Sequence, residues 1–399
     1  MAAINENGNS AYYAHIVGWG MSVPETVMTN SDISAIVDTT DDWIVARTGI
    51  HERRIANERE STATLGLKAA QVALERADML PIELDLIICA TSTPENVFPS
   101  SASLIQDWLG ANKAGAFDLS AACSGFVYAV QMAAQSIRSG SINRALVIGS
   151  ETMSRILDWQ DRSTCILFGD GAGAVVLERS TEPGGVLSGV LRSDGSGADL
   201  LGIPSVGSID VALAQILVEG HKPYKMHMAG GEVFKFATRV IGESVRQAVE
   251  QAGITMSDLK AIIPHQANMR ILEAAARALN VDKSLFVCNL DRYGNTSAAS
   301  IPIALAEAVQ SGHIVPGDYI ALVGFGGGLT WAAMVIQWTE RQKGTPFGGP
   351  RRQFSYTVSS ARSTLRRIGK RYGDLLRRVR PERGRMERLR RRIEKSDLD

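Results

Sequence analysis

The sequence has few cysteines, no long apolar run and no net charge. The first two features exclude classes of protein. Its four cysteines include no Cys-x-x-Cys pair, so neither a zinc site nor a disulfide framework is indicated. No apolar run reaches the length of a membrane span, and the polar first ten residues lack the layout of a signal peptide. We therefore expect a cytoplasmic protein in a reducing setting.

The absence of net charge conceals an uneven distribution along the chain. Residues 341–399 contain 19 Lys or Arg and 6 Asp or Glu, a balance of +13, so the rest of the chain carries −13. A basic extension of this kind can bind anionic lipid, nucleic acid or an acidic carrier protein. The alternative is a solvated extension, partly disordered or forming an amphipathic helix. We expect no specific nucleic acid partner, and we expect residues 1–13 to be flexible.

What the chain does contain is an internal repeat. The segments Ala73–Ala77 and Ala248–Ala252 each end an amphipathic helical pattern. Each is followed, in the same register, by an apolar strand pattern, Leu84–Ile88 in one case and Leu259–Ile263 in the other. The offset is 175 residues in both comparisons. Self-similarity at a fixed offset predicts two homologous halves, which we place at 14–180 and 181–340.

The same pattern predicts how the halves fold. Each half is expected to form a helix, a strand, two helices, a strand, a glycine turn and a strand. Strands made almost entirely of Val, Ile, Leu and Ala are typical of sheets that helices cover on both faces. Two such halves should pack as a five-layer α/β/α/β/α sandwich, an α/β fold with pseudo-twofold symmetry. Equivalent loops then converge, and the long connections Met153–Ser163 and Leu191–Met228 interrupt the symmetry.

Cys123 is the candidate nucleophile. It lies in Asp118–Gly125, where a strand is expected to end and a helix to begin within a few residues. Unpaired backbone N–H groups and the positive end of the helix dipole favour a thiolate there, and they can receive the oxygen of a tetrahedral intermediate. A small buried cysteine is the alternative, and we assign that role to Cys89, Cys165 and Cys288.

His265 and Asn295 occupy loops of the second half that should face Cys123. His265 follows an apolar strand and precedes a helical pattern, and Asn295 lies in the counterpart of the Cys123 loop. A structural histidine and a simple helix N-cap are the alternatives. The turn Gly326–Gly328 either brings backbone N–H groups to this site or is a tight hairpin, which is how we interpret Gly169–Gly173.

Six segments together resemble the β-ketoacyl-acyl-carrier-protein synthase III family, condensing enzymes of the thiolase fold. Any one of them is modest evidence, but six in the right order are strong. The resemblance spans about residues 14–338, and family members usually end near that point. The segments are Asp42–Ile50, Ala121–Phe126, Phe168–Ala172, Pro264–Asn268, Tyr293–Ser297 and Gly324–Gly328.

The resemblance implies a cofactor-independent acyltransferase that initiates fatty-acid synthesis. Cys123 would take an acyl group from acyl-CoA, and malonyl-acyl-carrier protein would then bind and lose CO2. The resulting carbanion would attack the acylated cysteine and give a 3-ketoacyl product. His265 and Asn295 would hydrogen-bond the thioester oxygen as the enolate develops. The N–H groups of Cys123 and Gly327 would form the oxyanion hole.

The resemblance also implies a set of substrate-binding residues. Trp43 and Arg47 would stack on and hold the adenine end of CoA, with ordinary packing at a helix end as the alternative. Arg162 and Arg270 would contact the phosphate or adenine of CoA, or the phosphopantetheine region of the carrier protein.

Two further residues have implied roles near the reacting groups. Asn268 would orient a water molecule near the site. Phe98 would reach into the acyl pocket of the partner subunit, because the family is homodimeric. The starter acyl chain is not determined by the sequence.

Relatives within the same fold stay as alternatives. Thiolases use a second cysteine near the second-half glycine turn, and Gly326–Gly328 offers none. Chalcone-synthase-like polyketide synthases also use Cys, His and Asn, but they act on CoA-bound malonyl units. A synthase-III-like acyltransferase of secondary metabolism and a non-catalytic thiolase-fold scaffold are the remaining alternatives.

Overall fold

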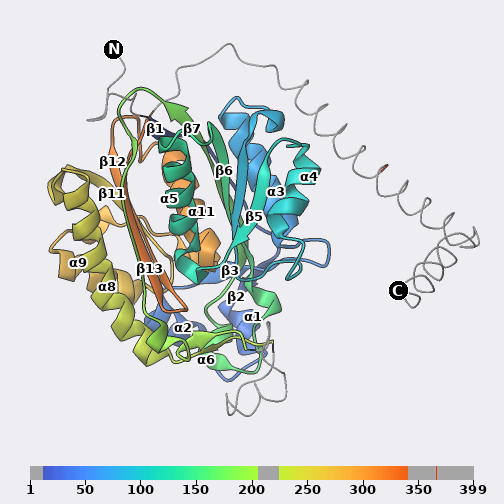
Figure 1. Cartoon of the computed structure of the whole chain (residues 1–399). Helices are drawn as coiled ribbons and strands as arrows, with labels where there is room; N and C mark the ends of the chain where they lie inside the picture. Colours follow the sequence, from blue (N-terminus) through green and yellow to red (C-terminus); the bar gives the residue numbers. More distant parts are fainter. Residues whose placement is uncertain (1–11, 205–223, 340–364, 366–399) are drawn as a thin grey trace, which may run out of the picture. The chain divides into compact units, whose positions relative to one another are not determined.

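The computed structural model describes residues 12–204, 224–339 and 365 (Figure 1). The first two ranges belong to one compact unit. The predicted flexible segment 1–13 is described only at its last two residues, and of the predicted basic extension 341–399 only Leu365 is described. Within these ranges, no helix combines the length and the apolarity that crossing a membrane requires.

The first half of the chain forms a five-stranded sheet with the strand order β1-β7-β6-β4-β5. In this sheet, β4 (Leu86–Ala90) pairs in parallel with β5 (Gly115–Leu119) and with the central strand β6 (Arg144–Thr152). On the other side, β7 (Asp170–Ser180) pairs antiparallel with both β6 and β1 (Tyr13–Ser22). All residues of β6 after its first are buried, as expected of a strand covered on both faces.

The second half forms a four-stranded sheet with the strand order β11-β12-β13-β8. Its strands are β11 (Leu259–Pro264), β12 (Tyr319–Gly326), β13 (Thr330–Gln337) and β8 (Gly185–Ser193). β11 and β12 are parallel, whereas β13 runs antiparallel to β12 and to β8. This order and these directions repeat those of β4, β6, β7 and β1, as the internal repeat of the sequence predicts.

The helices form three layers around the two sheets (Figure 1). α5 (Gly125–Arg138) and α11 (Ser300–Gln310) lie between the sheets, and their apolar residues share one core with both. α3 and α4 pack on the outer face of the first sheet, α8 packs on that of the second, and α9 packs on α8. The bounds of these four helices are Thr62–Arg76, Ser101–Leu109, Gly230–Gln251 and Met269–Leu279.

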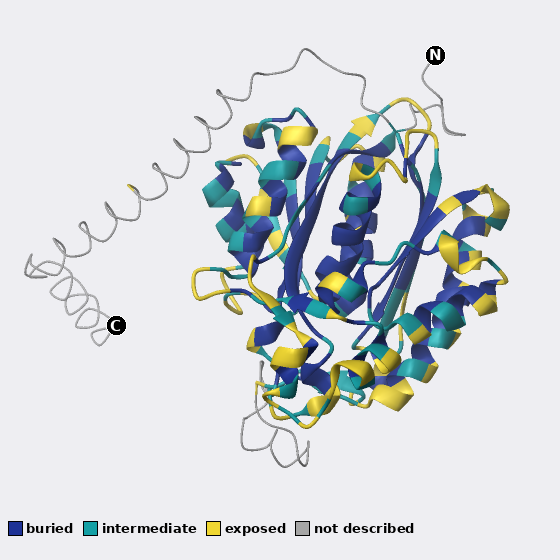
Figure 2. Ribbon diagram, turned by 180° about the vertical axis from the view of Figure 1, so that it is seen from behind, coloured by how far each residue is buried: buried dark blue, intermediate teal, exposed yellow. Residues whose placement is uncertain are grey.

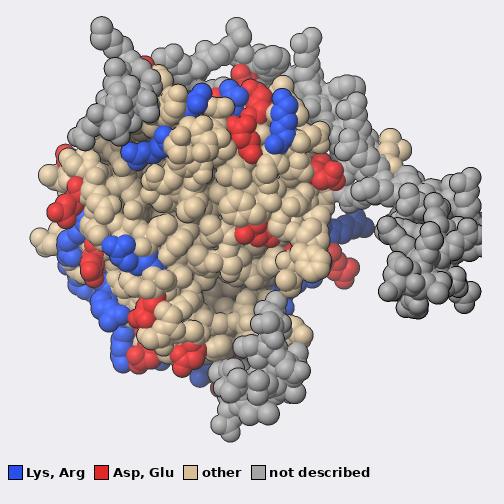
Figure 3. All heavy atoms as spheres, in the orientation of Figure 1, with Lys and Arg blue, Asp and Glu red and all other residues tan. Residues whose placement is uncertain are grey.

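The arrangement is the predicted five-layer α/β/α/β/α sandwich. Figure 2 shows that burial is concentrated in the two sheets and in the helix layer between them. Figure 3 shows Lys and Arg side chains interspersed with Asp and Glu along the edge where α8 and α9 lie. Most charged side chains of the described ranges are thus at the surface, whereas Arg53, Glu151 and Asp170 are fully buried.

Gly169–Gly173 does not form the predicted hairpin turn. Asp170 already begins β7, and the glycines of this strand and of β6 serve close packing instead. A Cβ atom at Gly173 would lie 2.6 Å from the Cβ atom of Pro302 in α11, and one at Gly149 would lie 2.3 Å from the backbone oxygen of Ala298, just before α11. Glycine at these positions therefore lets α11 lie directly on the sheet.

Smaller elements connect the strands and helices of the sandwich. In the long connection Leu191–Met228, the short strands β9 and β10 pair with each other, and residues 205–223 lie outside the described ranges. The helices and strands are α1 (Asn30–Ser34), α2 (Asp41–Thr48), α6 (Arg162–Cys165), α10 (Leu290–Tyr293), β2 (Val27–Thr29), β3 (Glu52–Arg54), β9 (Leu201–Gly202) and β10 (His227–Met228). The 3-10 helices are η1 (Pro81–Glu83), η2 (Ala122–Ser124), η3 (Met153–Arg155), η4 (Gly195–Gly197), η5 (Met256–Asp258), η6 (Lys283–Leu285) and η7 (Ser297–Ala299).

Candidate active site

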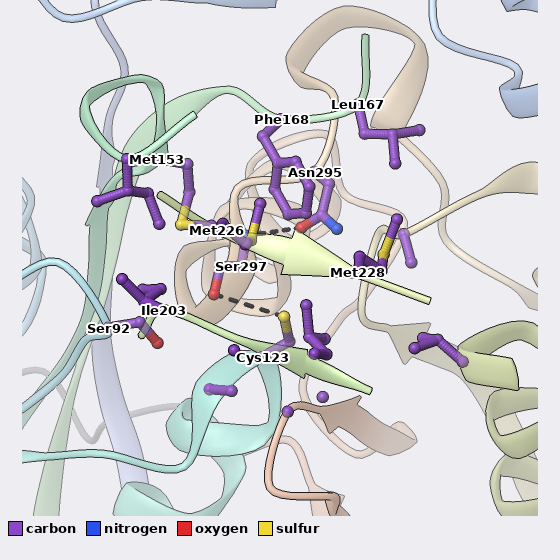
Figure 4. A pocket seen from close by; sticks show the side chains of 18 of the residues that line it. Ser92, Cys123, Met153, Leu167, Phe168, Ile203, Met226, Met228, Asn295 and Ser297 are labelled. Atoms are coloured by element: carbon purple, nitrogen blue, oxygen red, sulfur yellow. Dashed lines mark hydrogen bonds between the residues drawn. The ribbon is translucent and has the colours of Figure 1, made fainter. Parts of the chain in front are cut away.

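A cavity of about 1740 Å³ opens where the loops of the two halves converge, and Cys123, His265 and Asn295 all line it. Cys123 comes from the first half, and the other two residues come from the second. Figure 4 shows Cys123, Asn295 and Ser297 close to one another in this cavity, with apolar side chains around them. The structure therefore brings the three predicted residues to one place.

Cys123 lies in the short helix η2, which leads directly into α5. The preceding residue, Ala122, has a positive φ of 46°, and Ser297, its counterpart in the second half, has a φ of 49°. The two halves therefore begin their inner helices with the same backbone bend. This bend places the sulfur of Cys123 3.5 Å from the hydroxyl oxygen of Ser297 (Figure 4).

The thiol of Cys123 is protonated in the resting site, contrary to the prediction of a thiolate. The residue is only 7% exposed, and burial raises the pKa of Cys123 to about 12. The hydrogen bond with Ser297 acts in the opposite direction and lowers this pKa. The sequence shows the helix start that favours an anion, but it does not show that the second half of the protein removes water from the sulfur.

His265 follows β11 and is almost fully buried, with 1% exposure. Its Nδ1 atom lies 2.7 Å from the hydroxyl oxygen of Ser300, at the start of α11. The ring of Phe325 meets the imidazole edge to face, with 5.1 Å between the ring centroids. Burial lowers the pKa of His265 to about 3, so the imidazole is neutral at physiological pH.

Asn295 is 6% exposed and is held by both its backbone and its side chain. Its backbone N–H donates to the carbonyl of Leu167, and its own carbonyl accepts from Gly169. The side-chain oxygen Oδ1 accepts a hydrogen bond of 2.8 Å from the backbone N–H of Ser297 (Figure 4). The amide group Nδ2 is thus the donor that this side chain can offer to the cavity. The N-cap of α11 is Ala299, so Asn295 is not the simple N-cap of the alternative interpretation.

The predicted glycine turn of the second half is a tight turn beside the nucleophile. β12 ends at Gly326 and β13 begins at Thr330. A Cβ atom at Gly326 would lie 2.7 Å from the backbone nitrogen of Cys123 and 3.1 Å from its Cβ atom. Gly327 lines the cavity together with Cys123. The turn can therefore bring a backbone N–H group to the same oxygen as the Cys123 loop.

Three of the predicted binding residues form one cluster. Trp43 and Arg47 lie on α2 and line the cavity, and the Arg47 guanidinium carbon is 4.1 Å from the centroid of the indole ring. The guanidinium carbon of Arg162, on α6, is 4.8 Å from the same centroid. Arg162 itself is not among the cavity-lining residues, and it donates to the carbonyl of Asp38. The cluster joins an aromatic surface to two cations.

Asn268 and Arg270 also line the cavity, at the start of α9. The Asn268 side chain caps this helix by accepting from the backbone N–H of Arg270, and it donates to the carbonyl of Arg47. It therefore ties α9 to α2, and its predicted contact with water stays a prediction.

Phe98 is not among the residues that line this cavity, and it is 85% exposed.

Sequence reasoning missed two polar residues next to Cys123. Ser297 lies between Cys123 and the buried carboxylate of Glu151, which accepts a hydrogen bond of 3.0 Å from the Ser297 hydroxyl. Glu151 is fully buried at the end of β6. The signal in the sequence was an acidic residue two positions after the apolar run of 145–149. Among the described residues, no group of three His, Cys, Asp or Glu side chains could hold a metal ion.

The cavity also has an apolar wall that the sequence did not predict. Its side chains come from the two connections that interrupt the symmetry of the halves and from the turn between α6 and β7. This wall is suited to an acyl chain, since apolar surface gains most from being removed from water. The residues that Figure 4 labels are Met153, Leu167, Phe168, Ile203, Met226 and Met228.

Comparisons with known proteins find similar sequences over most of the chain. Two family models match, one described as 3-oxoacyl-[acyl-carrier-protein] synthase III over residues 117–195 and one as its C-terminal part over residues 249–338. A relative from Desulfitobacterium hafniense, named β-ketoacyl-[acyl-carrier-protein] synthase III, is 52% identical over 326 residues, which cover 82% of this chain and 98% of the relative. One of the same name from Roseiflexus sp. is 49% identical over 329 residues, covering 82% and 99%.

Solved structures give the same picture. The crystal structure of 3-oxoacyl-[acyl-carrier-protein] synthase III from Aquifex aeolicus has a TM-score of 0.76 and 46% identity, covering 82% of this chain and all of that one. The priming β-ketosynthase of a polyketide biosynthetic pathway has a TM-score of 0.77 and 35% identity, covering 83% and 97%. The folded part of the chain therefore matches these proteins over almost their whole length.

Proposed function

This chain belongs to the β-ketoacyl-acyl-carrier-protein synthase III family, and from that premise we propose which of its residues carry out the condensation. The enzyme is an acyltransferase that joins an acyl-CoA starter to malonyl-acyl-carrier protein by decarboxylative Claisen condensation, the first step of fatty-acid synthesis. The observation that carries the assignment of roles is the single cavity lined by Cys123, His265 and Asn295.

The first half-reaction is the acylation of Cys123. Its sulfur attacks the thioester carbonyl of acyl-CoA, and a tetrahedral intermediate with a negatively charged oxygen forms. The N–H groups of Cys123 and Gly327 receive this oxygen in our proposal. The close approach of Gly326 to the Cys123 nitrogen supports it, because the two backbones meet at the sulfur.

The second half-reaction is the condensation with malonyl-acyl-carrier protein. His265 and the Nδ2 group of Asn295 donate hydrogen bonds to the malonyl thioester oxygen while CO2 leaves and the enolate forms. Burial keeps the pKa of His265 at about 3, so the ring acts as a neutral donor. Decarboxylation itself supplies the carbanion, so the step needs neither a strong base nor a cofactor. The carbanion attacks the acylated Cys123.

Substrate binding is proposed at the wide end of the cavity. Trp43 and Arg47 hold the adenine of CoA. Arg162 packs on the indole ring of Trp43 and supports it. Arg270 offers its charge to a phosphate of CoA or of the phosphopantetheine arm. Asn268 orients a water molecule with the amide hydrogen that the Arg47 carbonyl does not occupy.

We also propose a cytoplasmic homodimer. Phe98 and its neighbour Val97 are 85% and 78% exposed, and Val97 lines the cavity. Two exposed apolar side chains beside a cavity are expected to be covered by a second copy of the chain, with Phe98 entering its acyl pocket. All four cysteines are free, which suits a reducing compartment. The basic extension lies almost entirely outside the described residues, and its contact with anionic surfaces stays a prediction.

One reconstitution tests the proposal. The purified full chain, given acetyl-CoA and malonyl-acyl-carrier protein, should release CO2 and form acetoacetyl-carrier protein. Intact-mass spectrometry after acetyl-CoA alone should show one acetyl group, which Cys123→Ala should abolish. Condensation only with malonyl-CoA would move the enzyme to the polyketide class, and an unmodified Cys123 would favour the scaffold alternative. A series of straight and branched acyl-CoAs would identify the starter.

A further inference from the structure

A buried carboxylate lies two hydrogen bonds away from the nucleophile. Glu151 is the second-last residue of β6 and is 0% exposed. The Cys123 sulfur donates to the Ser297 hydroxyl over 3.5 Å, and this hydroxyl donates to Oε1 of Glu151 over 3.0 Å. Since a serine hydroxyl can accept one proton while it donates another, the three groups form a continuous path for a proton.

The surroundings of Glu151 are suited to a carboxylate that gains and loses a proton. Oε1 and Oε2 accept from the backbone N–H of Ser92, and Oε2 also accepts from the hydroxyls of Thr91 and Thr93. These donors stabilise the anion. Burial acts against them and raises the pKa of Glu151 above its ordinary value. The donors and the burial of Glu151 thus act in opposite directions on its pKa.

We propose that Ser297 and Glu151 form a proton relay that accepts the thiol proton of Cys123 during acylation and returns it after condensation. The inference rests on the proposed function of Cys123 as the acyl carrier. Glu151 acts through Ser297 and does not touch the reacting atoms. The relay answers the finding that the sulfur is protonated at rest, which the proposed donors to the thioester oxygens do not address.

The proton balance of the cycle follows from this path. As the Cys123 sulfur bonds to the acyl carbon, its proton passes to the Ser297 oxygen, and the Ser297 proton passes to Glu151. The bond between the acyl carbon and CoA breaks, and the CoA thiolate takes a proton from water. When the carbanion later attacks the acyl group, Cys123 leaves as a thiolate. The same path, run in reverse, restores the thiol and the Glu151 carboxylate.

Other titratable groups near the relay do not offer an equivalent path. Cys89 of β4 interacts electrostatically with Glu151. It also interacts with Asp118 of β5 and with Glu95 in the loop after β4. Burial raises the pKa of Cys89 well above its ordinary value, so this thiol stays protonated. His265 lines the same cavity as the nucleophile and is neutral. Its Nδ1 atom contacts the hydroxyl of Ser300 at the start of α11. Ser297 is the side chain that joins the sulfur to a carboxylate.

The test measures how the rate of acylation depends on pH. The full-length wild type, Ser297→Ala and Glu151→Gln are mixed with acetyl-CoA, quenched on the millisecond scale and analysed by intact mass. Wild-type acylation should be nearly independent of pH between 7 and 9, because the carboxylate takes the proton. The variants should be slower by about 100-fold or more at pH 7, and their rates should rise about tenfold per pH unit as hydroxide removes the proton.

Asp170→Asn is the matched control. Asp170 is also a fully buried carboxylate of the first half, but it accepts from Ser154 and from the backbone of Ala56. Its variant should keep the flat wild-type profile. A merely structural role for Glu151 would lower the amount of active enzyme without changing the shape of the profile. If Glu151→Gln does not fold, Ser297→Ala decides the question.

Two results would overturn the relay. One is a flat pH profile at the wild-type rate in Ser297→Ala. The other is the same tenfold rise per pH unit in Asp170→Asn. Failure of the proposed function would look different, because the wild type itself would then show no acetyl group on Cys123 at any pH.

Discussion

The Nδ1 atom of His265 lies 2.7 Å from the hydroxyl oxygen of Ser300, and this contact determines what the imidazole can do. The Ser300 hydroxyl has one proton and two acceptors within reach. One is Nδ1 of His265, and the other is the carbonyl oxygen of Ser297, which is 2.9 Å away. When the hydroxyl donates to Nδ1, the ring proton is on Nε2, which can then donate to a thioester oxygen. In this arrangement Ser300 fixes both the orientation and the tautomer of His265, whereas donation of the hydroxyl to Ser297 would leave the ring proton on Nδ1.

Ser300→Ala should slow condensation much more than acylation. Without the hydroxyl, Nδ1 has no donor that keeps the proton on Nε2, so we expect the condensation rate to fall by about tenfold or more. The measurement is a single turnover of pre-acetylated enzyme with malonyl-acyl-carrier protein. Ser244→Ala is the control, because this buried hydroxyl donates to a carbonyl within α8. Equal rates for the two variants would contradict the role of Ser300.

The stability of the protein should depend on pH through His265. Its pKa is lowered from 6.5 to about 3 in the folded state, so the unfolded chain binds more protons between these values. The free energy of unfolding therefore falls as pH falls through this window, and His265 accounts for about 2 kcal/mol between pH 7 and pH 5. Urea titrations at the two pH values should show that the free energy of unfolding falls by about 2 kcal/mol less in His265→Gln than in the wild type. His313→Gln, at an exposed position, should behave as the wild type does.

Asn295→Asp should separate the two half-reactions. An aspartate keeps an oxygen for the backbone N–H of Ser297, but it replaces the Nδ2 donor by a second acceptor. We expect decarboxylation of malonyl-acyl-carrier protein to fall by about 100-fold or more, because the developing enolate loses a donor and meets a carboxylate. Acetylation of Cys123, followed by intact mass, should be largely retained. A parallel loss of both steps would show that the substitution disturbs the Cys123 loop instead.

The internal repeat is the reason why so much of this fold could be predicted. Its offset correctly paired α3 with α8 and β4 with β11, and it identified Asn295 as part of the counterpart of the Cys123 loop. β1 was missed, because Gly18 and Gly20 lower its strand propensity. Those glycines are required by packing, since a Cβ atom at Gly18 would lie 2.2 Å from the carbonyl oxygen of Ala73. Contacts of this kind are decided by another element and cannot be read locally.

The same limit applies to the site. Cys123, His265 and Asn295 could be predicted because each has a distinctive local position at the end of a strand or the start of a helix. Glu151 and Ser297 lie far apart in the sequence, and only the folded chain joins them. The protonation state of Cys123 was predicted wrongly for a related reason. The helix start is local information, whereas the burial that dominates the pKa comes from the other half.

Trp43→Ala should weaken the binding of acyl-CoA without changing the chemistry. If the indole carries the adenine, its loss should raise the KM for acetyl-CoA by about tenfold or more, because stacking on a base is lost. The rate with saturating acetyl-CoA should change little. Acetyl-pantetheine, which lacks the nucleotide, provides the control, since its kinetics should be the same in both proteins. An equal effect on both substrates would mean that Trp43 supports α2 and does not bind adenine.

Gly326→Ala should inactivate the enzyme although it adds a single methyl group. The new Cβ atom would lie 2.7 Å from the Cys123 nitrogen, which is closer than such atoms can approach, and a tight 3.1 Å from the Cβ atoms of Ala122 and Cys123. The backbone must shift there, so the proposed oxyanion donors move apart and acylation should slow by about 100-fold or more. Gly195→Ala is the matched control, because a Cβ atom there meets nothing within 4 Å. Stopped-flow acetylation with thermal unfolding of both variants distinguishes a displaced site from a general loss of stability.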